Sequence, residues 1–553
     1  MKQDLMQEKH PDAELAISRW SELKTTRAHH EQDWEDIARL IRPQRANFSV
    51  TMQRNKASTK ILSSAPVMAN TNLASGLYGT LTNPANRWMG FSVPQGTVDD
   101  SSAVKRWLDV VTTRVLASFQ PSMSPFYSAA IQLFTDLTAF GNAAQYDEVN
   151  QGEQRIMDVT LSLAEVCFEI DAYGRVSEVV RKFELMPEAA VGMFGADRVP
   201  PKVLEQAQQH KRELGTYYHH VRRNVNLRKG RIGPEGKRFS SVYAAEMGAT
   251  LLRRSGYDEM PFHAPRWEVE SGQVYGTGPA HVALASARMN NLMSDAVLRA
   301  GQRAADPTIL APDRDGFPLN GRIAPGQVVY GGTDQRGQPL LRPIDTTSQT
   351  GLTVELQAQV QEEIRDAFQW TLMNMAGRTG MTATEVVQIQ EEKMRLMAPF
   401  TGRVQEEFLH PKAMRRFNLL WRNGQLPPPP PEAEGVPLEV TYTSQAARAQ
   451  KSAEGASVMR LLADLGPLAQ VNPAYMDRVN PDETMEILQE AYGAPAKVLR
   501  SRDEMAALQA ERAEQQQMAE AMQMMQGGAS AAKDAAAAAG AMLPDGMAES
   551  GAE

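Results

Sequence analysis

The pattern of hydrophobic and polar positions is clearest between residues 279 and 424, where it predicts three helices. The first runs from Ala280 to Ala304, directly after Pro279, and ends before Asp306-Pro307. Proline is tolerated in the first turn of a helix, but it cannot continue one. Helical spacing predicts one packed side, which comprises Leu284, Ala287, Asn291 and Leu292.

The second helix is predicted over Thr353 to Met373 and is amphipathic. Its apolar residues recur at four-residue steps, at Leu356, Val360, Ile364, Phe368 and Leu372. Its acidic and amide residues fall elsewhere around the helix, at Glu355, Gln359, Glu362, Glu363 and Asp366. A helix of this size is about 30 Å long.

The segment between these two helices, residues 307–351, is rich in glycine and proline. It contains only short runs that favour β structure, at Ile309 to Leu310 and at Val328 to Tyr330. This composition predicts a projecting loop or a small β module.

A short loop from Asn374 to Met381 separates the second helix from a long third one. Thr382 and Glu385 have the spacing of a capping box, in which each side chain satisfies a free backbone N–H of the other residue. The third helix therefore begins there and can continue to Asn423, with kinks expected at Pro399 and Pro411.

The chain before residue 279 changes from a helical to a β pattern. Helices are predicted over residues 12–42, 61–82, 101–119, 125–140 and 200–214. From Gln154 onwards strands are predicted over residues 166–170, 176–183, 216–225, 240–245, 249–254 and 262–269. Helices followed by a block of strands indicate an α+β body, and the chain as a whole is predominantly helical.

Composition excludes several classes of protein. No apolar run approaches 18 residues and no signal peptide opens the chain, which predicts a soluble protein that is not exported by itself and not inserted in a membrane. The single cysteine, Cys167, excludes an intrachain disulfide framework. The net charge of −8 is concentrated in residues 501–553, where nine acids and three bases give −6. The rest of the chain is close to neutral, which does not favour tight capture of nucleic acid.

No motif that carries catalysis stands out. The Gly233-to-Lys237 stretch lacks the first glycine and the final Ser or Thr of a phosphate-binding loop, and no nucleophile elbow or spaced metal-ligand set is present. We therefore expect no enzyme activity, no cofactor, no metal and no catalytic residue.

The most basic part of the chain begins at His219-His220. It continues with the cations Arg222, Arg223, Arg228, Lys229, Arg231, Lys237 and Arg238. Such a cluster can contact phosphate, or it can be a solvated hairpin and loop. The sequence leaves both interpretations open.

The third long helix is followed by a different kind of sequence. Five prolines, Pro427 to Pro431, predict a stiff spacer. Helices are then predicted from residue 444 to about residue 525, and residues 526–553 lack core-forming residues and are expected to be disordered.

Several short stretches, taken in order, resemble the head-to-tail connector (portal) proteins of short-tailed, T7-like bacteriophages. They are Trp34 to Ala38 with Ile41 to Pro43, Ala69 to Leu77 with Leu81 to Pro84, Phe140 to Asn142, Pro265 to Glu268, Tyr275 to Pro279, Met381 to Val386, Gly402-Arg403 and Glu407-Phe408. Together they cover about Leu15 to Trp421.

The resemblance implies an architecture in which two stem helices are joined by a clip. Residues 1–278 would be a wing with its β-rich part at 154–270, residues 279–306 and 352–373 the stem, and residues 307–351 the clip. Residues 374–382 would be a channel loop, 383–424 a long kinked wing helix, 425–443 a proline-rich linker, 444–525 a helical crown and 526–553 an acidic tail.

The family also implies a function. Such subunits form a homo-oligomeric ring, typically of twelve, at one capsid vertex, and double-stranded DNA passes through it during packaging and ejection. The implied partners are the terminase large subunit, tail adaptor and tube proteins, and the major capsid and scaffolding proteins. The implied location is the virion, with the host cytoplasm during assembly.

Three groups of candidate site residues follow from this resemblance. The channel loop would present Asn374, Met375, Gly377, Arg378, Thr379 and Gly380. The stem acids Glu355, Glu362, Glu363 and Asp366 would face the channel or a neighbouring subunit, and the clip would dock partners through Arg314, Arg322 and Arg336. Arg378 would be the exposed cation nearest to DNA, or it would pair with a carboxylate of a neighbour.

Two other functions stay open at this point. One is a different virion assembly or tail protein, for which the helix–excursion–helix order is not needed. The other is a DNA-packaging enzyme, which the absence of a phosphate-binding loop disfavours.

Overall fold

The computed structural model describes residues 9–45, 61–94, 102–150, 155–305, 309–310, 350–374, 383–442, 455–467 and 479–492, with scattered positions within 333–343 and 505–518. The chain divides into two compact units. The larger comprises residues 1–90, 112–426 and 440–450, and the smaller comprises 91–111, 427–439 and 451–553. The fold consists mostly of helices, together with antiparallel sheets, and this confirms the predicted α+β class with a predominance of helix.

The helices of the larger unit follow most of the predicted ones. They are α1 (Pro11–Leu40), α2 (Ala65–Leu81), α4 (Phe126–Phe140), α5 (Pro187–Phe194), α6 (Pro201–Gln208), α7 (Pro279–Ala305), α8 (Thr350–Ala367), α9 (Trp370–Asn374), α10 (Ala383–Val404) and α11 (His410–Arg422). The sequence pattern missed α5, and it extended α6 to Leu214.

The larger unit contains a five-stranded antiparallel sheet in which each strand pairs with the next along the chain. Its strands are β4 (Val166–Ile170), β5 (Val176–Leu185), β6 (Gly215–Arg223), β7 (Phe239–Ala245) and β8 (Thr250–Tyr257). Such a meander needs only short connections, and the five strands lie within three residues of the predicted ranges.

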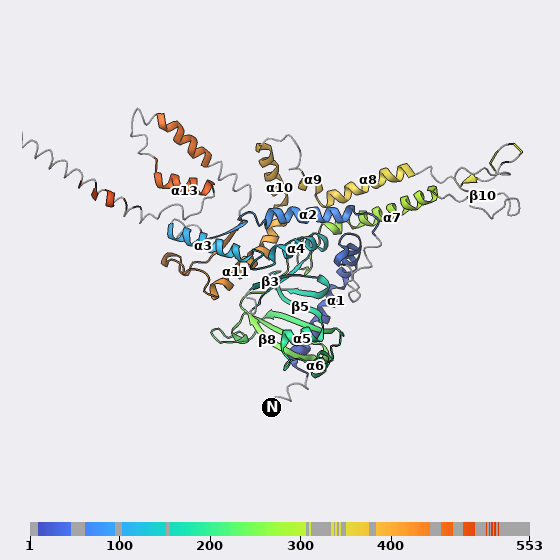
Figure 1. Ribbon diagram of the computed structural model, residues 1–553, viewed down its shortest axis with the longest axis horizontal. Coiled ribbons are helices and arrows are strands. Elements are labelled where there is room, and N and C mark those ends of the chain that lie inside the picture. The colour runs from blue at the N-terminus through green and yellow to red at the C-terminus, as the bar shows by residue number, and fades with distance from the viewer. Residues whose placement is uncertain are drawn as a thin grey trace, which may run out of the picture. The chain divides into compact units, whose positions relative to one another are not determined.

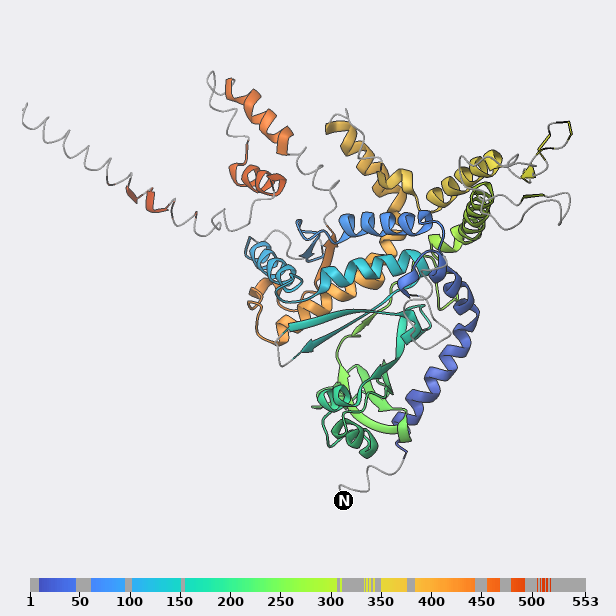
Figure 2. The ribbon, with the colours of Figure 1, turned by 45° about the vertical axis from the view of Figure 1, so that its right-hand side comes forward.

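The two faces of this sheet are covered by different helices. On one face, Ala16, Trp20 and Leu23 of α1 pack against Val180 and Tyr218. On the other face, residues of α5 and α6, among them Phe194 and Val203, pack against Tyr217 and Tyr243. Neighbouring residues of one strand thus serve opposite cores, and Figure 2 shows α1 (blue) on one side of the sheet.

A second sheet corrects the predicted start of the β region. Strand β2 (Ala144–Asn150) pairs with β3 (Arg155–Leu161) and with β9 (Phe262–His263), so this β-rich region begins ten residues before Gln154. The strand predicted over 262–269 is only two residues long. Beyond His263 the segment uses isolated bridges, at Arg266 and Glu268, instead of a continuous ladder.

The predicted continuous helix from Thr353 to Met373 is wrong, because it consists of α8 and α9 with a break at Gln369. Gln369 has a left-handed backbone (φ 51°), which ends the regular helix. Phe368, just before the break, is fully buried, and Met373 of α9 packs over Gly76 of α2, where a Cβ would lie 2.4 Å from the methionine sulfur. Packing against residues that are distant in sequence, such as Gly76, therefore accompanies a break that the local helical pattern did not predict.

The third helical stretch is continuous but not uniform. Between α10 and α11 the residues Gln405–Leu409 form one π-helical turn, which lies directly before Pro411. A proline cannot donate to the carbonyl four residues earlier, and a widened turn is one way in which a helix accommodates this. Pro399 lies inside α10.

The segment between α7 and α8 is described in part. Strand β10 (Ile309–Leu310) pairs with β11 (Arg342–Pro343) beyond the far ends of the two helices (Figure 1). The run Val328 to Tyr330 lies outside the described residues.

Among its described residues, the smaller unit holds the proline run, the helices at residues 455–467 and 481–492, and helical positions within 505–518. The indole N–H of Trp107 donates to the Pro427 carbonyl over 2.9 Å, next to the 3₁₀ turn Pro431–Ala433. Helix 455–467 contacts α13 (Pro481–Tyr492) closely, since a Cβ at Gly455 would lie 2.4 Å from that of Ala491. Three elements cross from one unit to the other along the chain: β1 (Met89–Ser92), α3 (Ser102–Ser118) and β12 (Glu439–Tyr442).

Among the helices of the described residues, none combines the length and the apolar character needed to cross a membrane.

The start of α7 is fixed by a backbone-to-backbone junction with the end of α4. Gly141 ends α4 in the left-handed region (φ 67°), and a Cβ on Gly278 would lie 2.8 Å from its nitrogen. Asn142 holds the two segments together, because its amide donates to the Gly276 carbonyl and accepts from the Gly276 N–H, both over 2.8 Å. Glycine is needed here because the two main chains touch.

We predict that Gly278→Ala destabilises the protein, because the new methyl group meets backbone atoms that cannot move aside. The expected loss in the free energy of unfolding is about 1–3 kcal/mol, the usual range for overpacking. Gly301→Ala is the matched control, since this α7 glycine faces open space and alanine favours helices by up to about 1 kcal/mol. Urea denaturation followed by circular dichroism measures both; equal stabilities would contradict the junction.

Candidate functional site

Helices α7 and α8 form an antiparallel pair with a polar seam. Ser286 of α7 donates to Glu363 of α8 over 3.1 Å. Ser294 lies about two turns further along α7, and it accepts from Gln357, which lies about two turns nearer the start of α8, over 2.8 Å. The two helices therefore run in opposite directions, as Figure 1 also shows. The seam therefore sets both the direction and the register of the pair.

Asn290 lies at the centre of this seam and is fully buried. Its carbonyl oxygen accepts from Gln357 and Gln361, each over 3.4 Å, and its amide donates to Ser63 over 2.8 Å. A buried amide must be satisfied, so sliding α8 along α7 would leave it unpaired at a cost of about 1–3 kcal/mol. The sequence pattern placed Asn291 on the packed side, but Asn290 is the buried residue.

The four stem acids all lie on exposed positions of α8. Glu355, Glu362 and Asp366 fall within about 40° of one another around the helix, at 3.6 residues per turn. Val360, Ile364 and Phe368, which are buried, lie on the opposite side. Arg365 offsets one charge by pairing with Glu362 over 3.0 Å. The acidic face therefore points away from the helices that α8 packs against.

An exposed apolar stripe runs along α7. It comprises Val282, Ala285, Met289, Leu292 and Ala296, spaced alternately three and four residues apart. The exposed fractions of the larger members are 76% for Val282, 45% for Met289 and 69% for Leu292. The predicted packing of Leu292 within the chain is therefore wrong. Alternating three- and four-residue spacing is typical of a seam that meets another helix.

Most of the remaining sequence-predicted residues lie outside the part of the chain that the structure describes. Asn374 is the last residue of α9, and Met375, Gly377, Arg378, Thr379 and Gly380 lie outside the described residues, as do Arg314 and Arg322. Arg336 lies in a turn between Thr333 and Pro339, which form an isolated bridge. The roles of these residues stay predictions.

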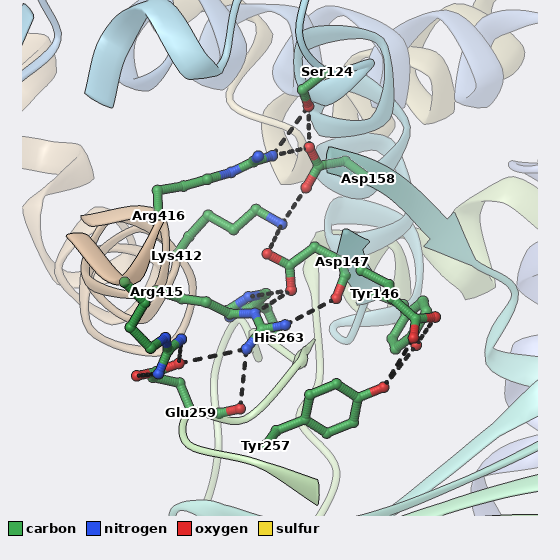
Figure 3. A network of polar contacts seen from close by, with 12 residues as sticks. Ser124, Tyr146, Asp147, Asp158, Tyr257, Glu259, His263, Lys412, Arg415 and Arg416 are labelled. Atoms are coloured by element: carbon green, nitrogen blue, oxygen red, sulfur yellow. Dashed lines mark hydrogen bonds and ion pairs between the residues drawn. The ribbon is translucent and has the colours of Figure 1, made fainter. Parts of the chain in front are cut away.

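Helix α11 is held in the larger unit by buried ion pairs that the sequence analysis missed. Lys412, Arg415 and Arg416 lie three and four positions apart on one face of the helix and are buried. They meet the carboxylates of Asp147 in β2 and Asp158 in β3 (Figure 3). Cations at these positions ordinarily indicate a solvated face. The one sequence signal against it was a pair of aspartates within apolar strands.

The charges of this network are paired across the helix and the strands. Arg415 donates from Nε to Asp147 Oδ1 over 2.8 Å and lies 3.7 Å from Glu259, which also pairs with Arg422 at 2.7 Å. Asp158 contacts Lys412, Arg416 and the Ser124 hydroxyl. Each of the three buried cations lies within ion-pair distance of a carboxylate, which offsets the cost of burying its charge.

The electrostatics of the network follow from burial. Burial alone raises the pKa of Asp147, but the charges of Arg415 and Lys412 outweigh it and hold that pKa well below its usual range. Burial, reinforced by Lys412, lowers the pKa of His263 to about 4, although Asp147 opposes the shift. At neutral pH His263 is therefore neutral and Asp147 is charged.

The π-helical turn has an ion pair of its own. The Arg266 guanidinium donates to Glu407 over 2.6 Å and to the Gly174 carbonyl over 2.6 Å, and the Arg266 N–H donates to the same carboxylate over 2.9 Å. Arg266 precedes α7 by only thirteen residues. One arginine thus ties the turn between α10 and α11 to the segment that leads into α7.

No group of three or more His, Cys, Asp or Glu within the described part of the chain has an arrangement that could hold a metal ion.

We predict that Asp158→Asn lowers the free energy of unfolding by about 3–5 kcal/mol, because it leaves Lys412 and Arg416 buried without this counter-charge. Glu22→Gln is the control. Its partner Arg19 forms a largely exposed pair, for which the expected loss is below about 1 kcal/mol. Urea denaturation compares the two variants, and a small loss in Asp158→Asn would show that the network does not hold α11.

The sequence was compared with protein families and with known proteins. Residues 13–499 match the family model described as bacteriophage head to tail connecting protein. The portal protein of Salmonella phage epsilon15 is 29% identical over 532 residues, covering 92% of this chain and 93% of the relative. The probable portal protein of Bordetella phage BPP-1 is 28% identical over 537 residues and covers 92% of each chain.

Among solved structures, the neck of an empty GTA particle is similar at 12% identity, with a TM-score of 0.36 over 72% of this chain and 86% of that chain.

The match over nearly the whole chain defines the class: this chain belongs to the bacteriophage head-to-tail connecting protein family. It is a connector of the phage particle, with relatives named portal proteins in two phages.

Proposed function

We propose that copies of this chain form a closed ring around a channel, and that double-stranded DNA passes through it as the phage head is filled and emptied. The observation that carries the proposal is the α7–α8 pair. It leaves an apolar stripe on one helix and an acidic face on the other, and neither packs within the described chain. A ring of identical subunits supplies a use for both faces.

The apolar stripe of α7 is proposed as a contact between neighbouring copies. Alanines stand at positions 285 and 296, where another helix can approach closely, and the larger Val282, Met289 and Leu292 can hold it. An exposed apolar stripe of this kind favours association over a monomeric state. A neighbouring copy is the occupant that a self-assembling connector provides.

The acidic face of α8 is proposed to line the channel. A channel must let DNA of any sequence slide without holding it. Cations along the wall would release counterions at every phosphate and so bind the DNA, whereas carboxylates repel it. Glu355, Glu362 and Asp366 are placed to do this, while Glu363 is partly engaged by Ser286.

The other parts are assigned on the same proposal. Residues 279–306 and 352–373 would be the stem, 307–351 a clip that docks partners through Arg314, Arg322 and Arg336, and 374–382 a channel loop presenting Arg378. Residues 1–278 and 383–424 would form the wing, and 444–525 the crown. Residues 425–443 would be the linker between them and 526–553 the tail. The break at Gln369, just before the loop, supports a change of chain direction there.

The partners follow from this placement. A connector between head and tail is a component of the virion. We propose a ring of twelve at one capsid vertex, assembled in the host cytoplasm with the major capsid and scaffolding proteins. It would dock the terminase large subunit first and tail adaptor and tube proteins later. The role is structural, with no chemistry of its own.

We predict that the purified chain forms rings in electron micrographs and that Leu292→Glu reduces the fraction of closed rings several-fold. A charge in the stripe must be desolvated when the neighbouring copy packs there. Leu298→Glu is the matched control. Leu298 is also exposed on α7, but it lies about 160° around the helix from the centre of the stripe.

Equal ring fractions in the two variants would remove the stripe from the interface. Monomers or fibres in the wild type, at several salt concentrations, would instead favour another assembly or tail role.

We predict that replacing Glu355, Glu362 and Asp366 by lysine leaves rings intact but lowers the DNA content of particles several-fold. Three added cations per copy would make the channel wall hold phosphates. The control reverses three exposed carboxylates elsewhere, Glu14, Glu22 and Glu205. Packaged DNA per particle is measured after nuclease treatment, and normal content in the stem variant would place the acidic face outside the channel.

A further inference from the structure

A second charged surface lies far along the chain from the stem, in the connection between β6 and β7. Residues 222–238, here termed the basic hairpin, contain seven cations and one acid, Glu235, a net charge of +6. The whole chain carries −8, so the other residues sum to −14. The positive charge of the hairpin is therefore a local feature that overall composition conceals.

The histidines that open the basic run are not part of this surface. His219 is buried, stacks on Tyr243 with ring centroids 3.8 Å apart, and bonds to Ser241 over 3.0 Å. His220 is buried and contacts Glu178 over 2.7 Å. The permanently charged residues begin at Arg222, near the end of β6, where the side chains are no longer buried.

The hairpin has a defined shape. The Asn224 amide donates to the carbonyls of Pro234 (3.2 Å) and Lys237 (2.9 Å), which closes the base of the loop. The Arg228 N–H donates to the Glu235 carbonyl over 2.8 Å. Gly236 lies so close to the Arg231 carbonyl that a Cβ would be 1.7 Å from its oxygen. The cations are thus presented by an ordered backbone.

Four of the seven cations have a carboxylate within ion-pair distance. Glu235 pairs with Arg231 at 2.7 Å and lies 3.9 Å from Arg228, Lys237 pairs with Asp258 at 2.6 Å, and Arg223 lies 3.8 Å from Asp171. Arg222, Lys229 and Arg238 make no ion pair with any residue that the structure describes. Lys229 and Arg238 are exposed and Arg222 is half-buried. Several positive charges therefore remain for a ligand.

Two aliphatic side chains stand among the cations. Val225 is 87% exposed and Ile232 is 98% exposed. Apolar side chains that stay exposed to water on an ordered loop add no stability to the fold. Next to cations they match the apolar sugar edges and base steps that line a groove of duplex DNA.

We infer that the basic hairpin binds the phosphate backbone of double-stranded DNA, without sequence preference, at a site distinct from the acidic stem. The cations would contact phosphates and release counterions, and Ile232 and Val225 would lie against the groove. An acidic protein surface is the competing ligand. It is less well matched because an array of six net charges over one hairpin suits a regularly charged polyanion. The inference rests on the proposed function in one respect, namely that double-stranded DNA is present where this protein acts.

The test removes the three cations that pair with no other described residue, so that no ion pair of the fold is lost. The full-length chain and the triple variant Arg222→Gln, Lys229→Gln and Arg238→Gln are titrated with a labelled duplex of about 30 base pairs and mixed sequence, at several salt concentrations. The control is Arg198→Gln, Lys211→Gln and Arg212→Gln, which changes the net charge equally at other exposed positions.

The expected result is a loss of affinity of at least about tenfold and a salt slope smaller by about two to three in the hairpin variant alone. Unchanged affinity and slope would overturn the inference. So would tighter binding of poly-L-glutamate than of the duplex at equal charge, which would assign the hairpin to an acidic protein. Micrographs of the same samples distinguish this inference from the proposed ring. If DNA binding depends on the hairpin but no rings form, only the ring proposal is refuted. If rings form but DNA binding does not depend on the hairpin, only the hairpin site is refuted.

Discussion

The pairing of α11 with charged residues of β2 and β3 is the interaction on which the larger unit depends. Three buried cations of the helix meet two buried carboxylates, one on each of these strands. Such a network adds little net stability compared with an apolar core, but it is intolerant of misalignment, because any unmatched charge is left buried. It therefore fixes where the long helix lies.

That placement is transmitted to α7 through a short chain of polar contacts. Glu407, in the π turn before α11, is held by Arg266, and the strand bridge and glycine junction beyond it lead directly into Pro279. Asn290 then fixes the register of α8 on α7. Each step is a directional contact between buried or closely packed groups, so the orientation of the stem pair is specified rather than loosely held.

The two charged surfaces of the molecule have opposite signs and suit opposite tasks. Carboxylates on α8 repel a polyanion and so favour its movement, whereas the cations of the β6–β7 hairpin attract it. The chain outside residues 501–553 sums to about neutral and so conceals both surfaces, which is why net charge alone indicated little about nucleic acid. What matters is how the fold distributes charge over separate surfaces.

The sequence by itself determined the helices α1, α2, α4 and α7 to within a few residues, the positions of the five strands β4 to β8, the acidic face of α8 and the family resemblance. These depend on local periodicity and on short motifs, which a single chain displays directly. Tertiary structure alone decided the break at Gln369, the exposure of Leu292, the burial of Asn290 and His219, and the pairing of Lys412 with Asp158. In each case the result depends on which segments far along the chain do or do not pack against the residue, and local spacing contains no information about that.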